Sequence, residues 1–221
     1  MDAEKLKDNY NNSYKKAKDN WSDTNSNYTD AIIRKIVKYI TNHGFRLNEG
    51  NKSLDVGCAK GYFTESFRKM GFDSFGFDYS DVAINIAKSN FSSCNFFIMD
   101  GFNPSLESNY DVIFMKGFSG TNTHDLKFVS EMSNKYIENL NKNGWFIISY
   151  PTDFSGKEKP NEMVNWSLKE IDELALKIKG AKLVSIQHFN YGFIWRQLRK
   201  VMNLVGFKRK YYFYLMFHKQ N

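Results

Sequence analysis

The length, composition and charge of this chain limit what it can be. Its 221 residues, 42% of them hydrophobic and 17% aromatic, are typical of one globular domain and exclude a disordered chain. No apolar run approaches the roughly 18 residues of a membrane-spanning helix, and the first ten residues are too polar for a signal peptide, so we expect a cytoplasmic protein without membrane insertion.

The formal net charge of +7 comes from the C-terminal segment. No acidic residue follows Glu173, whereas residues 190–221 carry Arg196, Arg199, Lys200 and four further basic residues. These seven charges equal the net charge, so the rest of the chain is balanced. The basic excess is therefore a local feature that could attract an anion.

The two cysteines do not indicate a disulfide framework or a zinc site. Cys58 and Cys94 lie far apart and lack metal-ligand spacing. Asp153 and His124 are potential ligands without a third at a recognisable spacing. We therefore expect no metal.

The N-terminal part predicts an arm followed by a core helix. Residues 1–30 are polar but contain Tyr14 and Trp21, which favours a loose helical arm that covers a site; a frayed terminus is the alternative. From Asp30 onward, apolar residues at helical spacing predict an amphipathic helix with Asp30 as its N-cap and an end near Gly44. We expect residues 31–221 to form the main domain.

After Lys52 the chain alternates between apolar strands and helical segments. Strands are expected at 53–56, 74–77, 96–99, 112–115, 145–149, 183–189 and 210–218. Helices are expected between them at 62–70, 81–89 and 126–140. This alternation predicts a parallel sheet with helices on both faces, and residues 151–180 and 190–207 are expected as substrate-side insertions.

Residues 54–63 form the stretch with the clearest chemistry, a strand, a glycine-bearing turn and a helix start. Gly57 allows the chain to reverse tightly, and Gly61 would let the backbone approach a ligand without a Cβ in the way. The helix start offers unpaired N–H groups. Such an elbow suits a cofactor lying across the carboxyl ends of a parallel sheet, although a plain strand-to-helix connection reads the same way.

Two further acidic residues follow the next two strands. Asp78 ends the second strand, 21 residues after Gly57, where a carboxylate can accept hydrogen bonds from ribose hydroxyls. Asp100 ends the third strand and could accept from the exocyclic amine of adenine. Together with Asp55 after the first strand, they form a spaced series that favours a nucleoside-containing ligand.

Four segments carry a family resemblance: 54–61 (LDVGCAKG), 76–80 (GFDYS), 99–101 (MDG) and 143–145 (NGW). In order and spacing they resemble the class I S-adenosylmethionine-dependent methyltransferases, over about residues 31–150. The resemblance implies a Rossmann-like, doubly wound α/β sheet of seven strands with an antiparallel last strand. It also implies S-adenosylmethionine as the cofactor and S-adenosylhomocysteine as its product.

By the pattern of that family, Asp55 and Gly57 lie near the methionine end, Asp78 holds the ribose, Tyr79 packs beside the adenine and Asp100 takes its amine. The other residues expected at the cofactor are Cys58, Gly61, Tyr62, Gly101, Phe102 and Lys116. Ala59 departs from the pattern, because this position is often a glycine.

A dinucleotide site is the main alternative for the elbow. It would require three glycines in Gly-x-Gly-x-x-Gly spacing, and this chain has two. Asp55 would repel a pyrophosphate but suits an ammonium or sulfonium group. The electrostatics therefore favour the methyl donor.

Transfer of a methyl group to an alcohol requires removal of a proton, so a base is expected at the carboxyl ends of strands four to six. His124 follows the fourth strand and is the first candidate, because imidazole titrates near neutral pH. His188, at the end of the sixth strand, is the second, and Asp153, after the fifth strand, is the third, with a plain loop carboxylate as its alternative. A helix-start role for His124 is the alternative.

The acceptor is expected to be small and anionic. Arg196, Arg199 and Lys200 share one face of a predicted helix that could clamp a phosphate or carboxylate. Tyr14, Trp21 and Asp153 are further candidates for acceptor binding. The chain also loosely resembles small-molecule methyltransferases that modify surface-polysaccharide precursors, which would make the acceptor a phosphorylated or nucleotide-linked sugar.

Two other functions stay open. An RNA methyltransferase would use the basic tail, but no binding module is appended and nucleic acid is not the expected partner. A non-catalytic subunit would bind S-adenosylmethionine without turnover.

Overall fold

The computed structural model describes residues 3–15, 26–157, 163–189 and 211–220. Its helices are α1 (Ala3–Lys15), α2 (Ser26–Asn42), α3 (Tyr62–Lys69), α4 (Asp81–Asn90), the 3₁₀ turn η1 (Ser119–Thr121), α5 (Leu126–Glu138) and α6 (Leu168–Lys177). Its strands are β1 (Lys52–Val56), β2 (Asp73–Asp78), β3 (Asn95–Ile98), β4 (Tyr110–Lys116), β5 (Leu140–Thr152), β6 (Lys182–Gln187) and β7 (Tyr211–His218).

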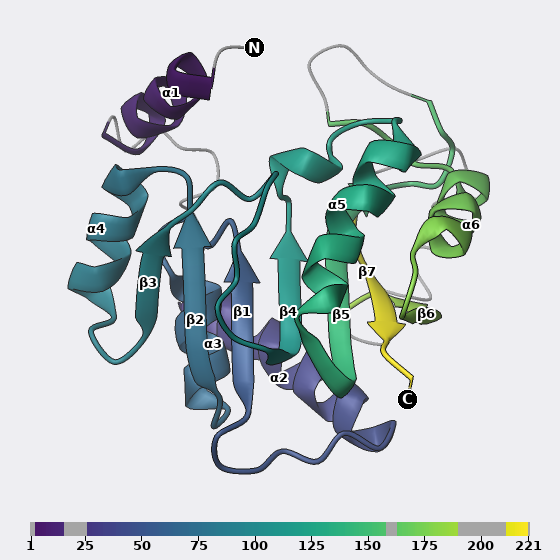
Figure 1. The fold of residues 1–221 in the computed structure, drawn as a ribbon, viewed down its shortest axis with the longest axis horizontal. Helices are drawn as coiled ribbons and strands as arrows, with labels where there is room; N and C mark the ends of the chain where they lie inside the picture. The colour runs from purple at the N-terminus through teal and green to yellow at the C-terminus, as the bar shows by residue number, and fades with distance from the viewer. Residues whose placement is uncertain (1–2, 16–25, 158–162, 190–210, 221) are drawn as a thin grey trace.

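The seven strands form one sheet in the order β3-β2-β1-β4-β5-β7-β6 (Figure 1). Only β7 runs antiparallel to its neighbours, β5 and β6. The predicted doubly wound α/β sheet with an antiparallel last strand is therefore confirmed. Since the other strands are parallel, their carboxyl ends meet at one edge, which is the upper edge in Figure 1.

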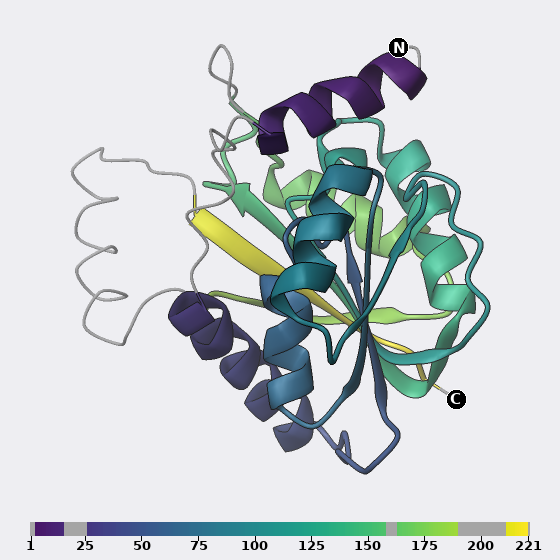
Figure 2. The ribbon, with the colours of Figure 1, turned by 90° about the vertical axis from the view of Figure 1, so that its left-hand side faces the viewer.

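The alternation of side chains along the central strands builds two cores, one on each face of the sheet. On β4, Val112 and Phe114 are buried with apolar residues of α2, whereas Ile113 and Met115 are buried with residues of α5 and α6. Successive side chains of a strand point to opposite faces, so a run of apolar residues suits a strand that is covered on both sides. Figure 2 shows α2 and α5 on opposite sides of the sheet.

Helix α2 begins earlier than predicted, and Asp30 is not its N-cap. The helix starts at Ser26, so Asp30 lies one turn inside it. Its carboxylate accepts hydrogen bonds from Ser66 Oγ (2.6 Å) and Lys69 Nζ (2.9 Å) of α3. The carboxylate that resembles a cap in the sequence therefore joins two helices.

The N-terminal arm contains a defined helix, α1, which lies above α4 and the carboxyl end of β2 (Figure 1). Asn11 makes the contact: its Nδ2 donates to Asp81 Oδ1 (2.7 Å), and its Oδ1 accepts from Ser80 Oγ (2.6 Å). The helix is thus held over the edge where the predicted site lies. Among the described helices, none combines the length and apolarity needed to cross a bilayer.

Lys219, one of the seven basic residues of the C-terminal segment, has a structural role. Its Nζ donates to the carbonyl oxygens of Ile137 (2.9 Å) and Leu140 (2.6 Å), at the end of α5 and the start of β5. An ammonium group satisfies helix-end carbonyls and complements the negative end of the helix dipole. This charge is therefore not available for an external anion.

We expect Lys219→Met to lower the free energy of unfolding by about 1–2 kcal/mol, because two carbonyls lose a charged donor. Urea denaturation measures the change. Lys177→Met is the control, since its ammonium only pairs with Glu173 on the surface of α6 (3.5 Å). The control should change stability by less than about 0.5 kcal/mol, and an equal loss in both variants would contradict the assignment.

Candidate active site

The elbow between β1 and α3 adopts the tight reversal expected from its glycines. Gly57, Ala59 and Gly61 all have positive φ angles, of 69°, 50° and 83°. Cys58 N donates to Phe77 O (2.8 Å), which ties the elbow to β2. The left-handed backbone explains why glycine suits position 59, and alanine there costs about 1 kcal/mol.

The absence of a side chain at Gly61 is required for packing. A Cβ at this position would lie 2.6 Å from the ring of Phe96 and 3.1 Å from Cβ of Ala87. Gly61 does not line the cavity described below. The missing side chain thus lets Phe96 of β3 and Ala87 of α4 pack against the elbow, and the expectation that it also admits the cofactor stays a prediction.

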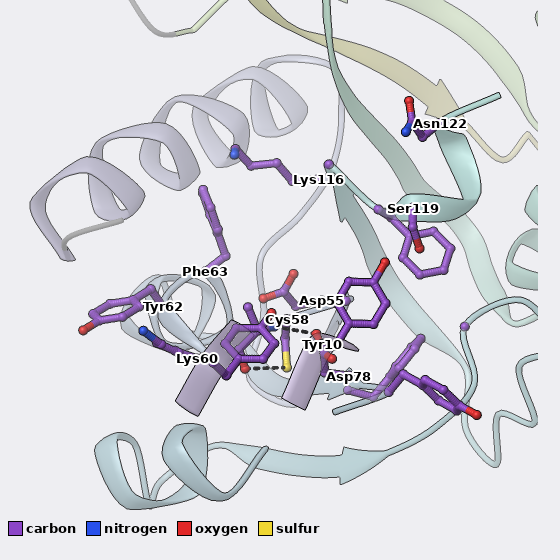
Figure 3. A pocket seen from close by; sticks show the side chains of 18 of the residues that line it. Tyr10, Asp55, Cys58, Lys60, Tyr62, Phe63, Asp78, Lys116, Ser119 and Asn122 are labelled. Carbon is purple, nitrogen blue, oxygen red and sulfur yellow. Dashed lines mark hydrogen bonds between the residues drawn. The ribbon is translucent and has the colours of Figure 1, made fainter. Parts of the chain in front are cut away.

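A cavity of about 520 Å³ opens at the carboxyl edge of the sheet, within the described part of the chain (Figure 3). The structure brings together at its wall all the predicted cofactor residues except Gly61: Asp55, Gly57, Cys58, Tyr62, Asp78, Tyr79, Asp100, Gly101, Phe102 and Lys116. The predicted acceptor residue Tyr14 also lines it. The remaining lining residues are Tyr10, Tyr28, Ala59, Lys60, Phe63, Phe77, Gly117, Phe118, Ser119, Asn122, Met163 and Tyr212.

Asp78 is the last residue of β2, and its carboxylate accepts hydrogen bonds from the backbone of the elbow and of the turn after β2. One oxygen accepts from Ala59 N (3.0 Å) and the other from Ser80 N (2.9 Å). Burial raises the pKa of Asp78, although these backbone hydrogen bonds oppose the rise. Each carboxylate oxygen can accept a second hydrogen bond, so this group can still bind a diol.

Asp55 lies at the base of the cavity, and its side chain is almost inaccessible. It accepts a hydrogen bond from Thr64 Oγ1 (2.8 Å) at the start of α3. Burial raises its pKa to about 7, the Thr64 bond opposes this, and the charge of Asp78 adds to it. A positively charged group near Asp55 would favour the ionised carboxylate.

Asp100 follows β3 on an exposed turn. One of its oxygens accepts from Phe102 N (2.9 Å), and Tyr136 OH donates to Gly101 O (2.7 Å), which holds the turn in place. Asp55 near the end of β1, Asp78 at the end of β2 and Asp100 after β3 thus face one cavity. Carboxylates suit a ligand that carries an amine, a diol and a cation.

The end of the cavity away from Asp78 and Asp100 is lined by the rings of Phe63 and Tyr212, with Lys116 beside them. Lys116, the last residue of β4, has its Nζ 3.9 Å from the ring centre of Tyr212 and 5.4 Å from that of Phe63. Burial lowers the pKa of Lys116 to about 8, and the charge of Asp55 opposes this. Figure 3 shows Lys116 beside Phe63, on the other side of Asp55 from Asp78.

Asn122 offers a directed donor at the rim of the cavity. Its Oδ1 accepts from Tyr150 OH (3.0 Å) and from Val164 N (2.8 Å). Because a backbone N–H can only donate, this bond fixes which side of the amide is oxygen. The NH₂ group is therefore the side of Asn122 that is free to serve a ligand.

Neither histidine predicted as a base reaches the cavity. The Nδ1 of His124 contacts the carboxylate of Glu170, and this pair joins the start of α5 to α6. His188 follows β6, at the outer edge of the sheet, and packs against the rings of Tyr211 and Phe213. Neither histidine is among the described residues that line this cavity.

The predicted acceptor residues are placed differently from one another. Asp153 does not line the cavity; its Oδ1 accepts from Ser155 N (2.9 Å) and from Asn165 Nδ2 (2.8 Å), and so shapes the loop after β5. Trp21, Arg196, Arg199 and Lys200 lie outside the described residues. Within the described residues, no group of three His, Cys, Asp or Glu side chains could hold a metal ion.

Several lining residues were not predicted, and topology explains why. Tyr212 lies near the start of β7, and it pairs with Pro151 at the carboxyl end of β5. An antiparallel strand begins at the edge where its neighbour ends, so its first residues reach the site. Phe63 is the second residue of α3, and Phe118 lies two residues after β4. These positions next to the elbow and to a strand end could have indicated them.

Comparisons with known proteins agree with this geometry. A family described as "Methyltransferase domain" matches residues 27–209. No curated protein matches the chain.

Three solved structures share its fold. An S-adenosylmethionine-dependent methyltransferase from Clostridium acetobutylicum has a TM-score of 0.64, with 11% identity over 100% of both chains. Magnesium protoporphyrin IX methyltransferase from Synechocystis, with bound S-adenosylmethionine, has a TM-score of 0.65 and 15% identity over 100% of this chain and 98% of that one. A TehB-like methyltransferase from Corynebacterium glutamicum has a TM-score of 0.56 and 17% identity over 99% and 98%.

The raised pKa of Asp55 makes folding stability depend on pH. Its pKa is about 7 in the folded protein and ordinarily 3.8, so folding favours the protonated carboxyl. This contribution is complete below the ordinary value and is lost as the pH rises through the folded value. The folded state should therefore lose stability between about pH 4 and pH 7 because of this group.

Asp55→Asn cannot ionise but keeps an oxygen for Thr64. As the pH is raised from about 4.5 to about 7.5, the free energy of unfolding of this variant should rise by roughly 1–3 kcal/mol relative to that of the wild type. Urea denaturation at the two pH values measures this. The same pH dependence in both proteins would show that Asp55 does not titrate in this range.

Proposed function

Because the chain belongs to the methyltransferase-domain family, we propose that it is an S-adenosylmethionine-dependent O-methyltransferase that acts on a small anionic acceptor. The observation that carries the proposal is the meeting of Asp55, Asp78 and Asp100 in one cavity, at the ends of adjacent parallel strands. These groups match the cation, the ribose and the adenine amine of the cofactor.

The described residues fit S-adenosylmethionine. The cavity volume of about 520 Å³ lies in the range of ligand sites. Asp78 would hold the ribose hydroxyls, Asp100 the adenine amine, and the rings of Tyr79 and Phe102 would pack beside the base. Asp55 would face the positively charged end. The cofactor supplies an activated methyl group on a positively charged sulfur; the protein binds, aligns and excludes water.

The acceptor would occupy the aromatic end of the cavity, between Phe63 and Tyr212. Ser119 and Asn122 offer polar groups that could orient a hydroxyl there. Rings on both sides keep water from the reacting atoms, which strengthens the electrostatic interactions of the site. A phosphorylated or nucleotide-linked sugar is an acceptor of this kind, with its anion held by the basic tail at Arg196, Arg199 and Lys200.

Helix α1 would act as the roof of the site. It places Tyr10 and Tyr14 on the cavity wall, and Asn11 bonds the two residues that follow Tyr79. A ligand in the cavity would lie beneath this helix. We therefore place residues 1–30 as the arm that covers the site of the domain 31–221.

Asp78→Asn should weaken binding of S-adenosylhomocysteine by about 10- to 100-fold, since hydrogen bonds to a charged acceptor are lost. Isothermal titration calorimetry measures this. Asp73→Asn is the matched control, because Asp73 begins the same strand at the opposite edge of the sheet. It should leave the affinity within about twofold. Absence of any binding of either cofactor form to the wild type would refute the proposed function.

Asn11→Ala should loosen α1, because two hydrogen bonds to Ser80 and Asp81 are lost. Hydrogen exchange of the α1 amides should accelerate by about three- to tenfold. Asn12→Ala is the control, because Asn12 is exposed and this substitution raises helix propensity by the same amount as Asn11→Ala. Equal exchange in the two variants would mean that Asn11 does not hold the helix.

A further inference from the structure

Methylation of a hydroxyl releases a proton, and the described wall of the cavity contains no histidine to receive it. Asp78 and Asp100 face the positions proposed for the ribose and adenine. Tyr212 is a poor base, because burial raises its pKa and keeps it a neutral phenol. Asp55 and Lys116 are the two remaining groups near the acceptor end that titrate near neutral pH.

Lys116 is held in an environment that disfavours a charged amine. It is enclosed by the rings of Tyr212 and Phe63, and among the described residues no carboxylate lies within 4.0 Å of its Nζ. Interaction with aromatic faces offsets only part of the free-energy cost of removing an ammonium group from water. Asp55, by contrast, lies at the base of the cavity and is engaged with Thr64.

The titratable groups beside Lys116 are the carboxylate of Asp55 on β1, whose charge acts on it, and the phenol of Tyr212 on β7, whose ring centre lies 3.9 Å from Nζ. Tyr28 of α2 lines the same cavity, and Phe63 of α3 adds an apolar ring. The charge of Asp55 favours the ammonium form. A sulfonium beside Asp55 would offset that carboxylate and repel a second positive charge. Cofactor binding should therefore shift Lys116 toward the neutral amine.

We infer, on the basis of the proposed function, that Lys116 is the catalytic base of the reaction. Its neutral Nζ takes the proton from the acceptor hydroxyl. The oxygen uses its electron pair to form the new bond to the methyl carbon, while the electron pair of the broken carbon–sulfur bond stays on sulfur. The ammonium of Lys116 then returns its proton to water.

Competitive labelling with acetic anhydride, followed by mass spectrometry across about pH 6 to 10, measures the titration of Lys116 without turnover. An unstructured lysine peptide serves as the standard, with a pKa near 10.4. We expect Lys116 to titrate at about 8 in the free protein. Its midpoint should lie about one pH unit lower with S-adenosylmethionine than with S-adenosylhomocysteine, because the two differ by one positive charge.

The two ligands are matched controls, because they cover the lysine to the same extent. Steric protection by the ligand lowers the extent of labelling but does not move the midpoint, so a difference in midpoint reports the sulfonium charge. A midpoint equal to that of the peptide standard would overturn the inference. So would equal midpoints with the two ligands.

Calorimetry in buffers of different ionisation enthalpy counts the protons released on binding. Near pH 8, S-adenosylmethionine should release a fraction of a proton from the wild type and from Lys127→Met, an exposed control on α5. Lys116→Met and Lys116→Arg should abolish this release, because neither side chain can lose a proton there. Release that persists in Lys116→Met but is lost in Asp55→Asn would assign the proton to Asp55 instead.

Methyl transfer from isotopically labelled cofactor to sugar phosphates and nucleotide sugars tests the catalytic role. Both Lys116 variants should lower kcat by about 100-fold or more, with the affinity for S-adenosylhomocysteine, which lacks the sulfonium charge, within about threefold. Activity of Lys116→Arg within a few-fold of the wild type would overturn the inference. If the wild type binds no cofactor, the proposed function fails; if it binds but Lys116 does not titrate as expected, only the base assignment fails.

Discussion

The burial of the Asp55 carboxylate at the end of β1 is the constraint on which the rest of the site depends. A charge removed from water must be met by donors or by opposite charge, or it is neutralised. Thr64 supplies one hydrogen bond, and Lys116 supplies a positive charge from β4. Burial raises the pKa of Asp55 and lowers that of Lys116, so both groups titrate near neutral pH. A charged ligand bound beside Asp55 would therefore change the protonation of both groups.

The aromatic walls extend this low-dielectric environment, and they come from separate parts of the chain. Tyr10 and Tyr14 are provided by α1, Phe63 by α3 and Tyr212 by β7. No local stretch of sequence contains this enclosure. It forms because a helix packs over the carboxyl edge and because the reversed strand β7 begins there. A single topological feature, one antiparallel strand, thus supplies a ring beside the buried lysine.

The histidines show how far residue chemistry predicts a base. His124 is an imidazole and follows β4, but its Nδ1 contacts Glu170 between two helices. His188 follows the outermost strand, two positions from β5. Lys219 is a similar case, because its charge serves the end of α5 rather than an external anion. Side-chain direction and position across the sheet decide these roles, and a linear pattern contains neither.

The sequence by itself determined the sheet, the elbow and the three acidic residues at the carboxyl ends of β1, β2 and β3. These features are local: apolar runs specify strands, glycine permits left-handed backbone, and parallel strands bring Asp55, Asp78 and Asp100 to one edge. Only the tertiary structure decided that Gly61 serves packing, that Asp30 joins two helices, and that Lys116 lies between Phe63 and Tyr212. The physical reason is that burial and neighbours across the fold, rather than sequence spacing, set the charge state and contacts of a side chain.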